Sequence, residues 1–155
     1  MSNKEQIEKA LKTTIPGDCD SRLIIIVRKY ISGKEIDNGH FGLICAHSTG
    51  IAFNTWGCTE SERNEWEVDY DNIVFNEKYT KEDFDSWRWN SFRKLILQVE
   101  NDKDFYNIKS KLERDKIPFR ICGEVFFGDE EVAIVVFPLS RENTPKYIKF
   151  LKVWK

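Results

Sequence analysis

The chain has 155 residues, enough for one domain with a substantial core, and its 24 Lys and Arg side chains are balanced by 26 Asp and Glu. A net charge of -2 argues against the global basic field typical of duplex-DNA-binding proteins, so any nucleic acid must be held by a local patch. The four cysteines lack metal-ligand spacing, and no apolar run is long enough to span a membrane. These features predict a cytoplasmic protein with reduced thiols and without a metal or cofactor.

The first residues are predicted to form an arm outside the domain. Ser2 and Glu5 have the spacing of a capping box, and Ile7 and Leu11 would share one face of a short charged helix. A frayed segment is the alternative. We therefore divide the chain into an arm of residues 1–20 and one α/β domain that follows it.

The domain opens with residues 23–27, a run rich in β-branched residues and apolar on both faces. This pattern predicts a central strand covered by helices on each side. A polar loop follows, and residues 40–56 are predicted to form a helix. We expect the small residues of this helix to pack closely on the sheet; they are Gly42, Ala46 and Gly50. Its buried bulk is expected from Phe41, Leu43, Ile44, Ile51 and Phe53.

The start of this helix is the first candidate site. Residues seven apart differ by about 20° around an α-helix and lie roughly 10 Å apart along it, so His40 and His47 share one face. The first turn also offers unpaired backbone N–H groups and the positive end of the helix dipole. Together with Arg28 and Lys29, this predicts an anion cradle. The alternative for each histidine is a hydrogen-bonded structural role.

An insertion is predicted at about residues 57–85, within the domain of residues 21–155. It is acidic and aromatic, residues 66–70 alternate like an exposed strand, and Thr80 has the character of a helix start. The insertion is expected to be a lid or a partner surface, or else an elaborated connection.

The second half of the chain carries three more predicted strands, at residues 93–99, 119–122 and 132–137, with a turn at residues 128–130 between the last two. Asn101 and Asp102 are expected to begin an amphipathic helix with Phe105, Ile108 and Leu112 on one stripe. Residues 146–154 form a closing helix or strand. The elements predict a mixed four-stranded sheet with helices on both faces.

Several segments occur in a familiar order. A strand at residues 24–29 precedes a helix with Cys45-Ala46-His47, Trp87 precedes by seven residues the Lys94 that leads the next strand, and residues 150–154 read Phe-Leu-Lys-Val-Trp. This order resembles the type-two peptidyl-tRNA hydrolases of archaea and eukaryotes. The resemblance covers most of the domain except the insertion, and it implies the fold of that family.

The family's catalytic positions are largely replaced. The resemblance places Gly39-His40 where the family has glycine-lysine, and Ile44 where it has glutamine, whereas His47 is retained. The family's aspartate-alanine-glycine segment is absent, and Glu124 is the only carboxylate close to its place. A hydrolase must activate water and stabilise an oxyanion, and most groups for these roles are missing.

The first hypothesis is therefore a non-catalytic protein that binds a nucleotide, a cyclic oligonucleotide signal or an RNA end. A small protein of this kind could sequester a nucleotide signal, as viral proteins that blunt host nucleotide signalling do. Aromatic side chains would stack on the bases, with Tyr30, Trp56, Trp87 and Trp89 as candidates. The predicted ligand-binding residues are Arg28, Lys29, Tyr30, Gly39, His40, His47 and Trp87.

Two other hypotheses stay open. An active peptidyl-tRNA hydrolase-like esterase would use His40 in place of the family lysine, with His47 or Glu124 as base. A protein-interaction module would have a stable partner or form a homodimer through the aromatic insertion.

Overall fold

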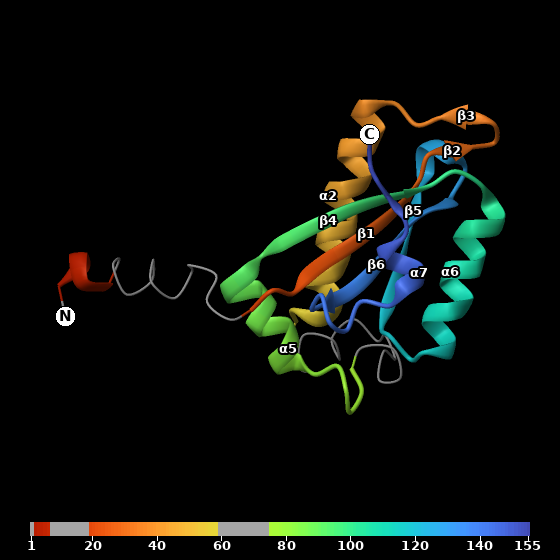
Figure 1. The fold of residues 1–155 in the computed structure, drawn as a ribbon. Helices are drawn as coiled ribbons and strands as arrows, with labels where there is room; N and C mark the ends of the chain where they lie inside the picture. The colour runs from red at the N-terminus through yellow and green to blue at the C-terminus, as the bar shows by residue number, and fades with distance from the viewer. Residues whose placement is uncertain (1, 7–18, 59–74) are drawn as a thin grey trace.

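A computed structural model describes residues 2–6, 19–58 and 75–155, and its centre is a five-stranded mixed sheet (Figure 1). The strand order is β5-β6-β1-β4-β7. These strands are β1 Arg22–Arg28, β4 Arg93–Val99, β5 Phe119–Glu124, β6 Glu130–Leu139 and β7 Lys152–Val153. The prediction of four strands is therefore wrong by one. The fifth strand, β7, has two residues, which is too short to give a periodic pattern in the sequence.

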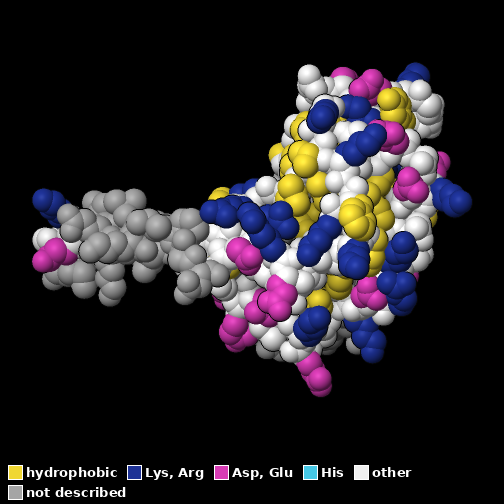
Figure 2. Space-filling model, in the orientation of Figure 1, with side chains coloured by type: hydrophobic (Ala, Val, Ile, Leu, Met, Phe, Trp, Pro, Cys, Tyr) yellow, Lys and Arg dark blue, Asp and Glu magenta, His cyan; other side chains and the backbone are white. Residues whose placement is uncertain are grey.

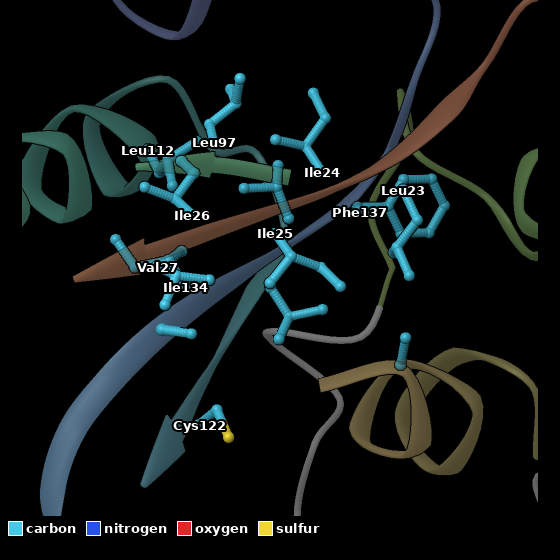
Figure 3. Close-up of a cluster of buried hydrophobic side chains, with 14 of the residues drawn as sticks. Leu23, Ile24, Ile25, Ile26, Val27, Leu97, Leu112, Cys122, Ile134 and Phe137 are labelled. Carbon is cyan, nitrogen blue, oxygen red and sulfur yellow. The ribbon is translucent and has the colours of Figure 1, made fainter. Parts of the chain in front are cut away.

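β1 is the central strand, as its apolar run predicted. It pairs in parallel with β4 and antiparallel with β6, and residues 23–27 are completely buried. Figure 3 shows its side chains alternating between the two faces of the sheet. Ile26 lies on the side of Leu97, whereas Leu23 lies on the other side with Phe137. Both faces must therefore be covered by other elements.

Helices cover both faces, as predicted. On one face, α2 (Asn38–Trp56) brings Trp56 to within 5.3 Å of Phe137 between ring centroids, and α5 (Lys81–Ser86) adds Phe84. On the other face, α6 (Asp102–Arg114) brings Leu112 to the side of Leu97 (Figure 3). In Figure 1, α2 crosses behind the strands and α6 runs beside them. α7 (Lys146–Lys149) precedes β7.

The face of α2 that packs on the sheet carries larger residues than expected. It consists of Ile44, Ser48, Ala52, Thr55 and Trp56, which are buried. The expected packing of Gly42, Ala46 and Gly50 on the sheet is wrong, because these three residues are exposed. Leu43, expected in the core, is also exposed. Burying Ile44 and Trp56 removes more apolar surface from water than burying glycine, and this decides the rotation of the helix.

The loop between β1 and α2 contains a small hairpin that was not predicted. β2 (Tyr30–Ile31) pairs antiparallel with β3 (Lys34–Glu35). Ser32 and Gly33 form its turn with φ of 53° and 78°, the left-handed conformation that two-residue hairpin turns require.

The structure confirms most of the predicted helix starts. Thr80 and Asp83 form the capping box that begins α5, and Asn101 caps α6 by accepting a hydrogen bond from the Asp104 backbone at 2.8 Å. Ser2 and Glu5 also form their predicted capping box. The stripe of α6 is buried as expected, with Phe105, Ile108 and Leu112.

Some predictions lie outside the described residues. These are Ile7 and Leu11 of the arm, the strand at residues 66–70, and the stretch of the insertion from 59 to 74. Within the ranges that the structure describes, no helix has the length and apolarity needed to cross a membrane.

Candidate functional site

Arg28, the first cation of the predicted anion cradle, is buried at the end of β1, with 4% of its surface exposed. Its guanidinium forms an ion pair with Asp102 and a second one with Glu130 at 3.1 Å, and it donates to the Glu131 carbonyl at 3.0 Å. It also lies 5.3 Å from the ring centroid of Phe105. Two carboxylates therefore already neutralise the charge of Arg28.

Lys29 is also engaged within the chain. Its Nζ lies 3.0 Å from a carboxylate oxygen of Glu35, donates to the Lys155 carbonyl at 2.6 Å, and lies 4.3 Å from the ring centroid of Trp154. Tyr30, the next residue, is exposed on β2. Lys29 thus supports the hairpin and the last residues of the chain.

His40 lies in a third setting, in the first turn of α2 beside the exposed Gly39. Its Nδ1 is 2.7 Å from Asp37, and its ring centroid is 4.0 Å from that of Phe126. Hydrogen bonds from His40, first from its backbone N–H, lower the pKa of the Asp37 carboxyl. No contact in the described part of the chain joins Arg28 or Lys29 to His40. Arg28, Lys29 and His40 are thus held by separate carboxylate partners rather than in one cluster.

Two of the catalytic candidates do meet. His47, two turns along α2 from His40, places its Nδ1 3.1 Å from Oε2 of Glu124 at the end of β5. The Glu124 side chain is 9% exposed, and Oε2 accepts no hydrogen bond from the described residues. Its other oxygen caps the turn Val125–Phe127 (η2), whose Phe126 covers His40. The two histidines therefore share one face of α2, as predicted, and this face lies beside the end of β5.

Trp87, predicted to stack on a ligand, is completely buried. Its ring packs against Phe53, Phe84 and Phe92, and its Nε1 donates to the Arg93 carbonyl at 2.8 Å. It presents no face to a ligand in this conformation, and the same holds for the completely buried Trp56.

The exposed aromatic and basic side chains gather instead where α5 runs into β4. Between them, the π-helical turn Trp87–Ser91 (η1) is followed by Phe92. Trp89 is 62% exposed and Phe92 47% exposed. We call this surface the basic–aromatic patch, and it consists of Arg22, Arg88, Trp89, Phe92, Arg93 and Lys94.

Cations lie directly on the rings of the patch. The Arg88 guanidinium carbon lies 4.6 Å from the Trp89 ring centroid, and Lys94 Nζ lies 3.2 Å from that of Phe92. A hollow of about 520 Å³ is lined by Phe53, Arg88, Trp89, Asn90, Ser91 and Phe92. An exposed ring beside a cation is the arrangement on which bases stack in single-stranded nucleic-acid sites.

The cations of the patch differ from Arg28 in their surroundings. Among the described residues, no ion pair involves Arg22, Arg88, Arg93 or Lys94. Arg22 and Arg93 are register partners on neighbouring parallel strands, so two positive charges lie side by side. Figure 2 shows Lys and Arg side chains gathered over the first part of β4.

Burial also disfavours the charged forms of two side chains in the patch. It lowers the pKa of Arg22, as does the nearby charge of Arg141, while Asp20 acts in the opposite direction. Burial also lowers the pKa of Lys94. A bound anion would relieve both effects.

The backbone at the patch is strained. The π-helical turn Trp87–Ser91 (η1) ends at Phe92, which has a φ of 49°, an unfavourable conformation for a bulky residue. The buried Trp87 and the hydrogen bond from Ser91 Oγ to the Ser21 carbonyl, at 2.6 Å, hold this turn in place. Such strain persists where surrounding contacts enforce it, and it is concentrated at functional sites.

The sequence reasoning named Trp89 as a stacking candidate but missed the rest of the patch. The available signal was the run Trp-Arg-Trp-Asn-Ser-Phe-Arg-Lys at residues 87–94, in which aromatic and basic residues interleave. Comparison with protein-family models and with curated proteins found no match.

Proposed function

We propose that the protein binds a nucleotide, a cyclic oligonucleotide or an RNA end through the basic–aromatic patch. The observation that carries this proposal is the pairing of exposed aromatic rings with cations that lack acidic partners in the described structure. On this proposal, Trp89 stacks on a base, while Arg93 and Lys94 neutralise the phosphates.

The chemistry of the patch favours holding a ligand over converting it. Its members are arginine, lysine, tryptophan and phenylalanine, none of which ordinarily titrates near neutral pH. Sequestration of a nucleotide signal needs only such binding groups. Unpaired bases are required for stacking, so the proposal favours single strands over duplexes.

Trp89 gives a direct readout of binding, because it is the only exposed tryptophan in the described part of the chain. We expect its fluorescence to be quenched on titration with short single-stranded RNA, cyclic dinucleotides or mononucleotides, and we expect a duplex of matched length to bind more weakly. The proposal fails if none of the three single-stranded or nucleotide probes binds at low salt and high protein concentration.

Substitutions locate the binding surface. Trp89→Leu should weaken binding by about 1–3 kcal/mol through lost stacking, measured by calorimetry. Lys103→Gln is the matched control, because Lys103 is an exposed cation on α6 away from the patch. Equal losses for Trp89→Leu and Lys103→Gln would assign the binding to general charge instead.

The pairing of His47 with Glu124 favours a second candidate function, a hydrolase. A carboxylate with little exposure, held beside a histidine, is an arrangement used for general acid–base catalysis, and His40 lies on the same helix face. The resemblance to type-two peptidyl-tRNA hydrolases suggests N-blocked aminoacyl-tRNA as the substrate. This candidate uses the end of β5 rather than the basic–aromatic patch.

The two functions are separable by assay. If the second is right, purified protein releases the acyl-amino acid from N-blocked aminoacyl-tRNA, and Glu124→Gln or His40→Ala slows release about 10²-fold or more. Trp89→Leu would then reduce affinity for the RNA without abolishing turnover. Absence of turnover in the wild-type protein would remove this candidate and leave the binding function untouched.

A further inference from the structure

α2 is a surface helix without a single Asp, Glu, Lys or Arg side chain. Its 19 residues, Asn38–Trp56, contain no Asp, Glu, Lys or Arg, in a chain that is 32% charged. A surface helix normally places charged residues on its solvent-facing side. The outward side of α2 instead carries Gly42, Leu43, Ala46, His47 and Gly50.

Two glycines on this outward side weaken the helix without serving the fold. Glycine in a helix interior is destabilising relative to alanine. A Cβ atom at Gly42 or Gly50 would meet nothing within 4 Å, so no contact of the described chain requires glycine at either position. Glycine at such positions permits the close approach of another backbone.

The residues beside the helix extend the apolar surface. Val125 and Phe126, in the turn after β5, are 79% and 68% exposed, and Phe126 lies against His40 of α2. Glu124 precedes them, is more than nine-tenths buried, and directs toward His47 an oxygen that accepts no hydrogen bond from the described residues. The surface thus combines exposed apolar groups with a buried carboxylate held beside His47, which is a costly combination for a surface facing only water.

We propose that this face of α2, with Leu43, Val125 and Phe126 at its border, is the contact surface for a second copy of the same chain. The order of small residues is symmetric about Ala46: in an antiparallel pairing of two α2 helices across a two-fold axis, Gly42 of each copy lies opposite Gly50 of the other. Small residues at these crossing points let the two backbones approach closely.

The charge distribution selects a second copy over an unrelated partner. Two-fold contacts bring each side chain near its own equivalent, so a charged residue close to the axis meets a like charge. α2 has no Asp, Glu, Lys or Arg side chain to repel its copy, whereas α6 carries all four types along its length. The described surface of α2 is thus suited to pairing with itself.

Added side chains on this face test the proposal. Sedimentation velocity over a concentration series should show wild-type protein as a dimer, and Gly50→Glu should convert it to a monomer. Because there is open space around Gly50, this variant should keep the fold, which circular dichroism can verify. Tyr106→Glu, at an exposed position of α6, is the control and should leave the dimer intact.

Two milder substitutions test how closely the two α2 helices approach each other. Gly42→Ala and Gly50→Ala should each weaken dimerisation about tenfold, because the added methyl groups overpack the crossing. In a protein without this contact, the same variants raise the melting temperature, because alanine favours the helix. A rise in melting temperature with unchanged sedimentation would overturn the proposal.

A crosslink locates the two-fold axis. In a Cys45→Ser background, Ala46→Cys should form a disulfide between copies on mild oxidation, since residues at the axis bring their Cβ atoms within about 4.5 Å. Tyr106→Cys in the same background should remain monomeric on a non-reducing gel. Wild-type protein that sediments as a monomer throughout, or a dimer unaffected by Gly50→Glu, would overturn the proposal.

Discussion

Arg28 and Arg93 lie on two neighbouring parallel strands, at opposite edges of the sheet, and their surroundings differ. Arg28, at the carboxyl end of β1, is buried against Asp102 and Glu130. Arg93, at the start of β4, is exposed beside Arg22 and forms no ion pair with any described residue. The first arginine serves the fold, while the second is available to an anion.

This comparison shows that a basic residue near the end of a strand is available to a ligand only if no carboxylate of the chain already neutralises it. Carboxylates from distant parts of the chain neutralise Arg28, and Glu35 neutralises Lys29. Among the described residues, the cations of the basic–aromatic patch have no ion-pair partner that a phosphate would have to displace, and this makes the patch the stronger candidate for phosphate binding.

The largest expected effect is on stability, and it distinguishes the buried Trp87 from the exposed Trp89. Trp87→Ala should lower the free energy of unfolding by about 3–5 kcal/mol, because it leaves a cavity between Phe53, Phe84 and Phe92. Trp89→Ala should change it by less than about 0.5 kcal/mol, since its ring is exposed. Urea denaturation measures both. Similar losses would mean that Trp89 supports the fold.

The next effect tests the two arginines. Arg28→Met should lower the free energy of unfolding by about 2 kcal/mol, because charge-assisted hydrogen bonds to Asp102 and Glu130 are lost. Arg93→Met should leave stability nearly unchanged and should weaken binding of the RNA probe. If instead Arg28→Met weakens binding in a protein of unchanged stability, Arg28 contacts the ligand.

A smaller effect concerns the pH dependence of binding. Burial lowers the pKa of Lys94, so Lys94 begins to lose its charge at a lower pH than an ordinary lysine. A bound phosphate favours the charged form, so affinity should fall as pH rises through this lowered pKa. Lys94→Arg should remove the fall, because arginine stays protonated. Calorimetric titrations at increasing alkaline pH measure the slope.

The smallest expected effect tests the charge of Glu124 at the end of β5. Burial raises the pKa of the Cys122 thiol, the Ser48 hydroxyl opposes this, and the charge of Glu124 raises it further. Glu124→Gln should therefore slightly increase the rate at which iodoacetamide alkylates Cys122, measured by mass spectrometry. Cys45, whose pKa is also raised by burial, should react slowly in both proteins. An unchanged rate at Cys122 would mean that Glu124 does not influence the reactivity of this completely buried thiol.

Much of the fold follows from local sequence signals. The apolar run of β1 and the 3.6-residue period of α6 are strong enough to define a central strand and a helix without tertiary information. β7 and the β2–β3 hairpin were missed because each strand has only two residues. The rotation of α2 was misjudged because its small residues were assumed to face the sheet.

The sites were harder to predict, because their chemistry depends on contacts between distant segments. Nothing near Arg28 in the sequence indicates that Asp102 and Glu130 will reach it. The family resemblance named His47 and Glu124 only as alternative bases, and it did not predict that the two side chains lie 3.1 Å apart. By contrast, the aromatic–basic run at residues 87–94 is local, and its interleaved pattern was a usable signal.

The antiparallel pairing of β1 with β6 joins the beginning of the domain to a segment near the end of the chain, from Arg22 to Leu139. During translation, the apolar residues 23–27 of β1 therefore emerge long before β6, one of their two neighbouring strands, has been synthesised. Such non-local pairing makes folding slow and exposes the nascent chain to aggregation. We expect synthesis of this protein to benefit from chaperones that shield the strand during that interval.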